Sequence, residues 1–322
     1  MTHKIVLCDA NTARHCLPLS GLSVPTIIIP AGEDHKTLET VQFIWHEMNR
    51  LQMTRESVLL NLGGGVVCDM GGFAAATFKR GVHFVNMPTT LLAMVDAAQG
   101  GKTGCNFDGL KNQIGVFAQP DEVVINTAFL QTLPAEELLA GAAEMLKHGL
   151  LKGKAEWADV LNFDWQAPDF AALAPMIERS VGIKQHFVDI DPHDYGLRKA
   201  LNLGHTFAHA FEELALHKGY TLRHGAAVAA GLVCALYASV VKLHFPVEQL
   251  RQTAAWVHQH FSPLNITCDD YPALLEYMQA DKKNADGKIC FTLLRTIGDP
   301  QVNQQLTEED IKESLDFLRE SN

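Results

Sequence analysis

The stretch Arg198-Lys-Ala-Leu-Asn-Leu-Gly-His-Thr-Phe-Ala-His-Ala-Phe-Glu212 combines a mostly apolar composition with a regular row of polar residues. Read as one helix, it carries these polar residues at spacings of four, three and four, on one stripe of its surface: Arg198, Asn202, His205 and His209. Almost every other position is apolar or small, so we expect the helix to be buried on most sides. Buried Arg, Asn and His side chains are costly unless they are paired. The stripe therefore indicates either a set of satisfied core residues or a binding site.

The composition limits the classes of protein to which the chain can belong. Its 322 residues are 47% hydrophobic and 20% charged, which is typical of a soluble globular protein with room for two domains. A formal net charge of −11 argues against a nucleic-acid partner, which would require a basic surface. Seven scattered cysteines without a Cys-x-x-Cys pair indicate reduced thiols in a cytoplasmic protein. We recognise no apolar run of about 20 residues and no signal peptide, so we expect no membrane partner.

The first part of the chain alternates β-branched apolar runs with helical patterns. We expect strands at residues 4–8, 25–30, 57–62, 82–87 and 122–126, and helices at 37–53, 66–78 and 89–98. This alternation predicts a parallel sheet with helices on both faces, which binds ligands at the carboxyl ends of its strands.

After Leu133 helical patterns dominate the sequence. They cover residues 135–151, 170–188, 199–216, 224–245, 246–261 and 271–278, followed by one strand at 288–294 and a helix capped by Thr307. We therefore predict an α/β domain in residues 1–133 and a mainly α-helical domain in residues 134–322.

Two glycine-rich stretches invite nucleotide-binding interpretations. Gly63-Gly-Gly-Val-Val-Cys-Asp69 lies between a strand and a helix, where backbone amides can cradle a phosphate. The dinucleotide fingerprint fails there, because Cys68 occupies the position of the third glycine. In Gly100-Gly-Lys-Thr103, Asp96 stands where a P-loop requires its first glycine, so we reject an NTPase. The region from Asp96 to Gly115 nevertheless carries Lys and Asn residues among five glycines, which resembles a loop around an anion more than a solvated loop.

A metal site is a second hypothesis from the residues alone. Glu144 lies among apolar residues in the helix expected at 135–151, so its carboxylate requires a cation or a salt bridge. Lys147, three residues later, could supply that salt bridge. His205 and His224 are the imidazoles that, with Glu144, would give three zinc ligands and one open position. The zinc-protease motif His-Glu-x-x-His is absent, and both the metal site and the structural ion pair stay open.

Several stretches taken together resemble the 3-dehydroquinate synthase family of sugar phosphate cyclases. They run in family order from about residue 30 to about residue 300: Gly-Gly-Gly-Val-Val-Cys-Asp-Met-Gly-Gly-Phe, Pro-Thr-Thr-Leu-Leu-Ala-Met-Val-Asp, Gly-Gly-Lys-Thr-Gly, Gly-Leu-Lys-Asn-Gln-Ile-Gly, Ala-Glu-Met-Leu-Lys-His-Gly, Leu-Asn-Leu-Gly-His-Thr-Phe and His-Gly-Ala-Ala-Val-Ala-Ala-Gly. The block Leu-Asn-Leu-Gly-His-Thr-Phe is highly specific. The resemblance implies a Rossmann-like nucleotide-binding α/β domain, then a mainly α-helical domain that holds metal and substrate, in a homodimer.

The resemblance also implies roles for individual residues. It implies a zinc ion, for which cobalt could substitute, on Glu144, His205 and His224. It implies NAD contacts from Asp9, Asn11, Glu33, Lys36, Gly64, Gly65, Val66, Asp69, Thr89, Thr90, Lys102, Lys111, Phe129, Leu130, Gln131 and Thr132. Substrate positions are Asp96, Lys102, Asn112, Lys147, Lys184, Arg198, Asn202, His209 as proton relay, and one of Lys282 and Lys283. Arg80 matches an arginine that reaches the partner's site across the dimer interface.

The reaction implied converts 3-deoxy-D-arabino-heptulosonate 7-phosphate into 3-dehydroquinate and phosphate. Its steps are transient oxidation by NAD, β-elimination of phosphate, re-reduction and intramolecular aldol closure. Alternatives are a cyclase of the 2-deoxy-scyllo-inosose or valiolone type, a glycerol-dehydrogenase-like metal-dependent oxidoreductase, and a catalytically silent binding protein. Arg198 and Asn202 favour a substrate that carries a carboxylate. The N-terminus is shorter than the family's, and Asp194 and Ala226 replace two glutamates of the family, which puts the support of the ligands in question.

Overall fold

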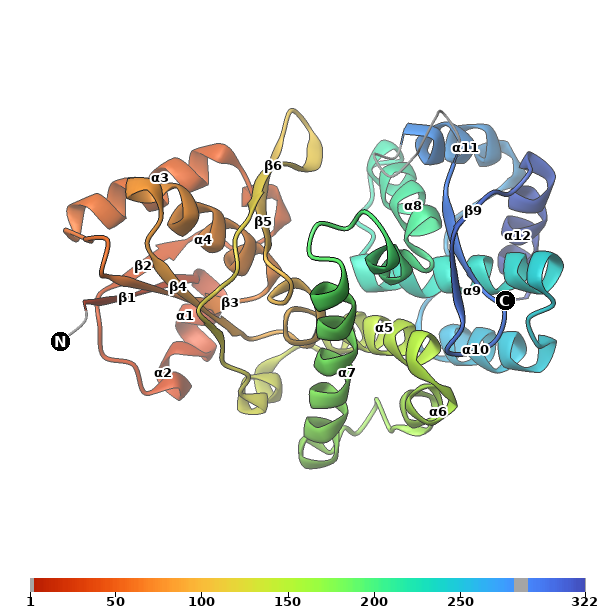
Figure 1. Ribbon diagram of the computed structural model, residues 1–322, viewed down its shortest axis with the longest axis horizontal. Coiled ribbons are helices and arrows are strands. Elements are labelled where there is room, and N and C mark those ends of the chain that lie inside the picture. Colours follow the sequence, from red (N-terminus) through yellow and green to blue (C-terminus); the bar gives the residue numbers. More distant parts are fainter. Residues whose placement is uncertain (1–2, 281–288, 322) are drawn as a thin grey trace. The chain divides into compact units, whose positions relative to one another are not determined.

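The computed structural model describes residues 3–280 and 289–321, and the chain divides into two compact units (Figure 1). Unit 1 comprises residues 1–141 and 169–181, and unit 2 comprises residues 142–168 and 182–322. Two helices contain residues of both units, α5 (Ala135–Lys152) and α7 (Phe170–Ile190). The domain boundary at residue 133 stays a prediction. Lys282 and Lys283 lie outside the described residues.

Unit 1 is built on a parallel sheet of five strands in the order β2-β1-β3-β4-β7. The strands are β1 (Lys4–Asp9), β2 (Thr26–Ile29), β3 (Val58–Gly63), β4 (His83–Pro88) and β7 (Glu122–Val123), and the helices of this part are α1 (Ala10–His15), α2 (Leu17–Ser20), α3 (Leu38–Arg50) and α4 (Gly65–Thr77). The α/β class predicted for the first part of the chain is confirmed. Because β1 has β2 on one side and β3 on the other, the carboxyl ends of β1 and β3 flank the switch point at which such sheets bind ligands.

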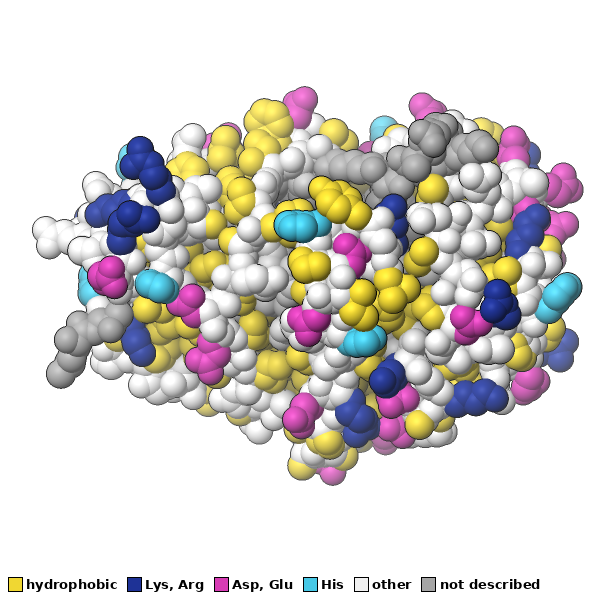
Figure 2. Space-filling view, viewed as in Figure 1, with side chains coloured by type: hydrophobic (Ala, Val, Ile, Leu, Met, Phe, Trp, Pro, Cys, Tyr) yellow, Lys and Arg dark blue, Asp and Glu magenta, His cyan; other side chains and the backbone are white. Residues whose placement is uncertain are grey.

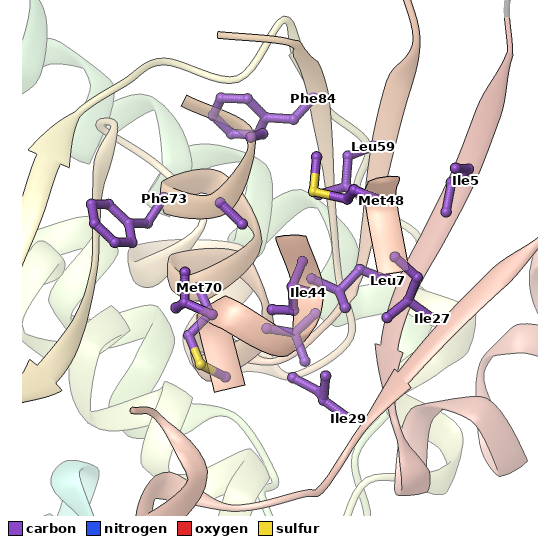
Figure 3. Packing of buried hydrophobic residues seen from close by; sticks show 14 of the residues in the cluster. Ile5, Leu7, Ile27, Ile29, Ile44, Met48, Leu59, Met70, Phe73 and Phe84 are labelled. Atoms are coloured by element: carbon purple, nitrogen blue, oxygen red, sulfur yellow. The ribbon is translucent and has the colours of Figure 1, made fainter. Parts of the chain in front are cut away.

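The core of unit 1 lies between the sheet and helices α3 and α4 (Figure 3). It is formed by strand and helix residues that point toward one another, among them Ile5, Leu7, Ile27, Ile29, Leu59, Phe84, Ile44, Met48, Met70 and Phe73. Val6 and Cys8, which alternate with these residues in β1, are also fully buried. Strand β1 is therefore covered on both faces, as its uninterrupted apolar sequence requires.

The glycine-rich stretch after residue 100 forms an antiparallel hairpin and not the loop that the sequence predicted, while its binding of an anion stays a prediction. Strand β5 (Lys102–Phe107) pairs with β6 (Leu110–Phe117), and Asp108 and Gly109 connect them with φ values of 52° and 75°. Asp-Gly is a preferred sequence for a two-residue hairpin turn, because both of its residues must adopt positive φ. A Cβ on Gly104 would lie 2.3 Å from the backbone oxygen of Ile114, so this glycine permits the close approach of the two strands.

Unit 2 is mainly helical, as predicted for the second part of the chain. Its further helices are α6 (Lys154–Asn162), α8 (His205–His217), α9 (His224–Leu243), α10 (Val247–His260), α11 (Tyr271–Ala280) and α12 (Glu308–Glu320), and its antiparallel strands are β8 (Phe291–Leu294) and β9 (Pro300–Gln304). The sequence did not predict α6 or β9. The predicted cap of α12 is confirmed, because the Thr307 hydroxyl accepts a hydrogen bond from the Asp310 amide at 3.2 Å.

The stretch from Arg198 to Glu212 is not one helix, so the predicted single stripe is wrong. A 3-10 helix, Leu197–Asn202, ends before Gly204, whose φ is 79°, and α8 begins at His205. A Cβ on Gly204 would lie 2.8 Å from the Leu232 amide, and a Cβ on Gly231 would lie 2.2 Å from the Gly204 oxygen. The chain therefore breaks the helix where its backbone crosses α9 closely, and only glycine fits both positions.

Helix α9 corrects another expectation. Its length and composition would allow it to cross a membrane, with a mean hydropathy of 2.0, so the expectation that no such apolar run exists is wrong. In the structure α9 packs against α8, α10 and α12, and 67% of its most apolar 18-residue window is buried inside the protein. The hydropathy of α9 is therefore explained by its position as a core helix of unit 2.

Candidate functional site

One carboxylate and two imidazoles lie close together in unit 2, those of Glu144, His205 and His224. Glu144 Oε1 lies 3.3 Å from Nε2 of His205 and 3.5 Å from Nε2 of His224. One ligand atom of each residue lies within 4.8 Å of those of the other two. The three residues belong to three different helices, α5, α8 and α9, so tertiary packing alone creates the group. The residues predicted as metal ligands are therefore brought together.

The second ring nitrogen of each histidine faces an oxygen. His205 Nδ1 lies 3.2 Å from the Leu203 carbonyl oxygen, and His224 Nδ1 lies 3.5 Å from Glu212 Oε2. Histidines that bind metals commonly donate their remote N–H to a carbonyl or a carboxylate, which fixes the tautomer and the ring orientation. Beside His224, the sequence predicted no role for Glu212. Its spacing of seven residues from His205, two turns along α8, was the signal that could have identified its role.

Glu144 is an anion in an almost closed environment. It is fully buried, and its carboxylate forms an ion pair with Lys147, which is itself only 1% exposed. Burial raises the pKa of the Glu144 carboxyl, but the charges of Lys147 and His205 outweigh it and hold that pKa well below its usual range. Neither carboxylate oxygen has a hydrogen bond of good geometry among the described residues. Ionic contacts without directional hydrogen bonds fit a cation ligand better than a purely structural ion pair.

The pKa of His224 reports the same negative field. Burial lowers the pKa of the His224 imidazole, whereas Glu144 and Glu212 raise it. The two carboxylates outweigh burial and raise the pKa of His224 to about 10. A positive charge between these groups is therefore favoured, whether a proton or a metal ion supplies it.

Four further residues predicted to contact substrate belong to unit 2. His209 lies one turn beyond His205 on α8, with ring centroids 5.7 Å apart and ring planes inclined by 86°. Lys184 and Arg198 are buried, whereas Asn202 and His209 are partly exposed. Within unit 2, the structure brings His209 and Lys147 directly to the Glu144, His205 and His224 group.

Asp191 organises the loop that carries Arg198, and the sequence did not predict it. The Asp191 carboxylate accepts hydrogen bonds from the amides of Gly196 at 2.6 Å, Tyr195 at 3.0 Å and Arg198 at 3.2 Å. Burial raises the pKa of Asp191, but these backbone hydrogen bonds outweigh it and lower that pKa. The Arg198 guanidinium itself donates to the Pro192 carbonyl at 2.8 Å. Asp is favoured in loops because its side chain binds nearby amides, which is the signal that was available.

The predicted NAD residues of unit 1 follow the carboxyl ends of its parallel strands. Asp9 ends β1 and caps α1, and its carboxylate accepts a hydrogen bond from the Thr12 amide at 2.8 Å. Gly64 caps α4 directly after β3, and the Thr89 amide, directly after β4, donates to the Gly63 oxygen at 3.0 Å. The other members are Asn11 in α1, Glu33 after β2, Gly65, Val66 and Asp69 in α4, Thr90 after β4, and Phe129, Leu130, Gln131 and Thr132 in the 3-10 helix Thr127–Thr132. Carboxyl ends of parallel strands share one edge of a sheet, so most of this set gathers there.

A buried lysine links two other predicted residues of unit 1. Lys36 is 4% exposed, and its Nζ lies 2.6 Å from Asp69 Oδ2 and 2.6 Å from Asn112 Oδ1. Burial lowers the pKa of Lys36, but Asp69 outweighs it, so that pKa is raised and the ammonium stays charged. This link ties the first turns of α4 to the β5–β6 hairpin. Lys102 and Lys111 are exposed on the same hairpin.

Two other predicted residues of unit 1 lie on unusual backbone. Asp96 belongs to a π-helical turn, Ala93–Ala97, where the sequence predicted an α-helix over residues 89–98. Turns of this kind are frequent at functional sites. Arg80 is exposed at the turn between α4 and β4.

On the face shown in Figure 2, basic and acidic side chains are interspersed, and the basic ones form no continuous stripe.

The sequence of this chain is similar to that of known enzymes over nearly its full length. Residues 26–140 match the family described as 3-dehydroquinate synthase N-terminal, and residues 141–284 match 3-dehydroquinate synthase C-terminal. A 3-dehydroquinate synthase of Parabacteroides distasonis is 46% identical over 321 residues, which cover 98% of this chain and 91% of the relative. A 3-dehydroquinate synthase of Pseudomonas fluorescens is 41% identical over 305 residues, 92% of this chain and 81% of the relative.

Solved structures agree with the predicted fold class. A 2-epi-5-epi-valiolone synthase from Streptomyces hygroscopicus, solved with NAD+ and Zn2+ bound, is 26% identical and superposes with a TM-score of 0.84 over 100% of this chain and 92% of the other. A 2-deoxy-scyllo-inosose synthase complexed with carbaglucose-6-phosphate, NAD+ and Co2+ also superposes with a TM-score of 0.84, over 99% of this chain and 91% of the other. Its sequence identity is 24%, so this similarity concerns the fold alone. A probable glycerol dehydrogenase from Sinorhizobium meliloti gives 0.61 at 16% identity over 99% and 91%. The chain is therefore an enzyme that belongs to the 3-dehydroquinate synthase family.

Proposed function

We propose that this chain is a 3-dehydroquinate synthase, a lyase that converts 3-deoxy-D-arabino-heptulosonate 7-phosphate into 3-dehydroquinate and phosphate. The observation that carries the proposal is the convergence of Glu144, His205 and His224 in a chain that is 46% identical to a relative of that name. The Lys147 ammonium, which forms an ion pair with Glu144, and the buried Lys184 and Arg198 of the same unit fit a small substrate that carries both a phosphate and a carboxylate.

We propose that Glu144, His205 and His224 hold a divalent cation, Zn2+ or Co2+. Three arguments support it: the donor set is one that zinc prefers, both Glu144 oxygens lack hydrogen bonds of good geometry among the described residues, and both histidines have oxygen partners for their remote nitrogens. The Zn2+ in the valiolone synthase structure is consistent with this.

We propose NAD as the cofactor of unit 1, at the carboxyl edge of its sheet. Glu33 follows β2, the position at which dinucleotide-binding folds carry an acidic residue for the 2′-hydroxyl of the ribose, which favours NAD over NADP. Gly64 and Gly65 expose the amides that begin α4, where the helix dipole favours the pyrophosphate. When bound, the cation supplies Lewis acidity and NAD supplies a reversible acceptor for a hydride.

The side chains of the protein would bind, orient and move protons. His209 is our choice for the proton relay, because it is partly exposed yet adjacent to His205. The phosphate would be held by Lys102, Asn112, Lys147 and Arg198, and the sugar and its carboxylate by Lys184 and Asn202. Lys147, Lys184 and Arg198 are buried, and a buried cation interacts more strongly with an anionic substrate than one in water. Asp96 also belongs to the proposed substrate set.

Release of phosphate from the heptulosonate, measured with and without added NAD and chelator, tests the proposed function. We expect turnover only with NAD and a divalent cation, no accumulation of NADH, and no turnover of glucose 6-phosphate or sedoheptulose 7-phosphate. Faster turnover of either sugar would favour a cyclase of the 2-deoxy-scyllo-inosose or valiolone type. Accumulation of NADH with glycerol would favour a polyol dehydrogenase, and binding of zinc and NAD without phosphate release would favour a silent binding protein.

We further propose a cytoplasmic homodimer in which Arg80 reaches the site of the partner subunit. Mixing an Arg80→Ala variant with a His205→Ala variant tests this, because a hybrid dimer then has one complete site if Arg80 acts across the interface. Random mixing makes half of the dimers hybrids, so about a quarter of the wild-type activity should return at low substrate concentration. No gain over the separate variants would refute action across the interface.

A further inference from the structure

The turn between α4 and β4 has an unusual backbone. Lys79 and Arg80 have φ values of 50° and 66°, and Gly81 follows with a φ of 113°. They are the only adjacent non-glycine residues with positive φ in the described ranges 3–280 and 289–321. Side chains disfavour this left-handed region, and such strain persists only where surrounding contacts impose it.

Lys79 supplies the contacts that hold the turn. Its Nζ donates a hydrogen bond to the backbone oxygen of Met53 at 2.6 Å and lies 5.4 Å from the centroid of the Phe78 ring. Met53 is fully buried in the core of unit 1, so the lysine ties the turn to a rigid point of the fold. The Gly81 amide closes the turn by donating to the Phe78 oxygen at 2.9 Å.

The turn presents Arg80 in a fixed direction. Arg80 is exposed, and no residue of the described ranges forms a hydrogen bond or an ion pair with its guanidinium. A merely solvated arginine needs no strained backbone, because a relaxed turn would expose it equally well. The combination of strain, anchor and unpaired guanidinium indicates that the direction of this side chain matters. A guanidinium recognises planar carboxylates and phosphates through paired N–H groups, which makes its binding sensitive to direction.

We propose that Lys79 is a positioning residue for Arg80. Its hydrogen bond to the Met53 carbonyl maintains the left-handed turn and thereby aims the Arg80 guanidinium at an anionic group of the sugar phosphate. This inference rests on the proposed role of Arg80 in substrate binding. Lys79 itself touches neither substrate nor cofactor, so its effect should pass entirely through Arg80.

A double-mutant cycle on the full-length enzyme, loaded with zinc and NAD, tests this inference. Arg80→Ala should raise KM for the heptulosonate about 10- to 100-fold, since it removes a charged hydrogen bond. Lys79→Met, which keeps the length of the side chain and removes the donor, should raise KM about 3- to 10-fold with kcat within about twofold, as for lost uniform binding. Lys79→Arg, which retains a donor, should restore KM. Lys79→Met should add nothing to Arg80→Ala.

The possible results separate this inference from the proposed function. If Arg80→Ala leaves KM unchanged, the proposed role of Arg80 fails and the inference fails with it. If Arg80→Ala raises KM but Lys79→Met does not, Lys79 has no positioning role and the function of Arg80 stands. Additive effects in the double variant would overturn the inference, because Lys79 would then act on its own. A thermal unfolding scan of each variant is the control. A large fall in Tm, together with a fall in kcat as large as the rise in KM, would make Lys79 merely structural.

Discussion

The Glu144→Gln variant should destabilise unit 2 strongly when the protein is free of metal. Gln has nearly the volume of Glu, so packing is kept and only the negative charge is lost. The ammonium of Lys147, 1% exposed, then loses the carboxylate that neutralises it. Removal of one partner of a buried ion pair costs about 3–5 kcal/mol. For a folding unit of this size each kcal/mol lowers Tm by about 2–4 °C, so we expect Tm to fall by roughly 10 °C.

Two matched variants show whether the charge pair is the cause. Lys147→Met should cost less, about 1–2 kcal/mol, because the imidazoles of His205 and His224 remain beside the carboxylate and can take up protons. The double variant with both changes should recover most of the stability, because two neutral side chains of similar volume replace the pair.

Tryptophan fluorescence during heating, after treatment with a chelator, is a suitable assay. Three of the four tryptophans, Trp157, Trp165 and Trp256, belong to unit 2, so the signal reports mainly on that unit. A Tm for Glu144→Gln within about 2 °C of the wild type, with no recovery in the double variant, would refute the reasoning. Glu144 would then be no desolvated anion, and the main physical argument for a cation at this point would be lost.

The remaining predictions concern the ligands, the helix crossing and a cap. His205→Ala should lose bound zinc and turnover while the protein stays folded, whereas His217→Ala, an exposed histidine on the same helix, should keep both; metal analysis and the phosphate assay decide. Gly231→Ala should cost about 1–3 kcal/mol and weaken zinc binding, because its Cβ would lie 2.2 Å from a backbone oxygen. Gly182→Ala in α7, where a Cβ meets nothing within 4 Å, is the neutral control. Equal free energies of unfolding in urea for Gly231→Ala and Gly182→Ala would contradict a close contact between α8 and α9 at Gly231. Burial raises the pKa of the Asp310 carboxyl, but Lys242 and the Thr307 cap outweigh it and lower that pKa, so Asp310→Asn should cost about 1 kcal/mol at neutral pH. The loss should be complete above the unfolded-state pKa of about 4 and should shrink as the pH falls from there through the lower pKa of the folded state, where the native carboxylate is protonated; a constant difference in Tm would contradict it.

The sequence predicted elements well where local pattern and tertiary structure agree. The strands of unit 1 are apolar β-branched runs bounded by turns, and β1, β2, β3 and β4 lie within two residues of their expected limits. Helix α12 was found from its cap at Thr307. The hairpin β5–β6 was missed although Asp108-Gly109 is a strong turn signal, because its glycines were interpreted as a binding loop.

The candidate site was predictable in its chemistry but not in its geometry. Glu144 was conspicuous because a carboxylate stood among apolar residues, and the block around His205 carried the resemblance to the family. Periodicity alone, however, extended one helix through Gly204, because no local signal reports a contact with α9. Glu212 and Asp191 were missed for the same reason: their partners become neighbours only after the helices have packed or the loop has folded back.

The close crossing at Gly204 and Gly231 explains why Gly204 is as important as His205 in the block Leu-Asn-Leu-Gly-His-Thr-Phe. It brings the first turn of α8 against α9, and His205 is the first residue of that turn. His224 begins α9, so the crossing point and the two helix starts together fix how far apart the two imidazoles lie. A side chain at either glycine would push the helices apart by more than the tolerance of a metal–ligand distance, which is about 0.2 Å. Gly231→Ala and His205→Ala should therefore impair the same site, the first by changing its geometry and so weakening zinc binding, and the second by removing a donor atom.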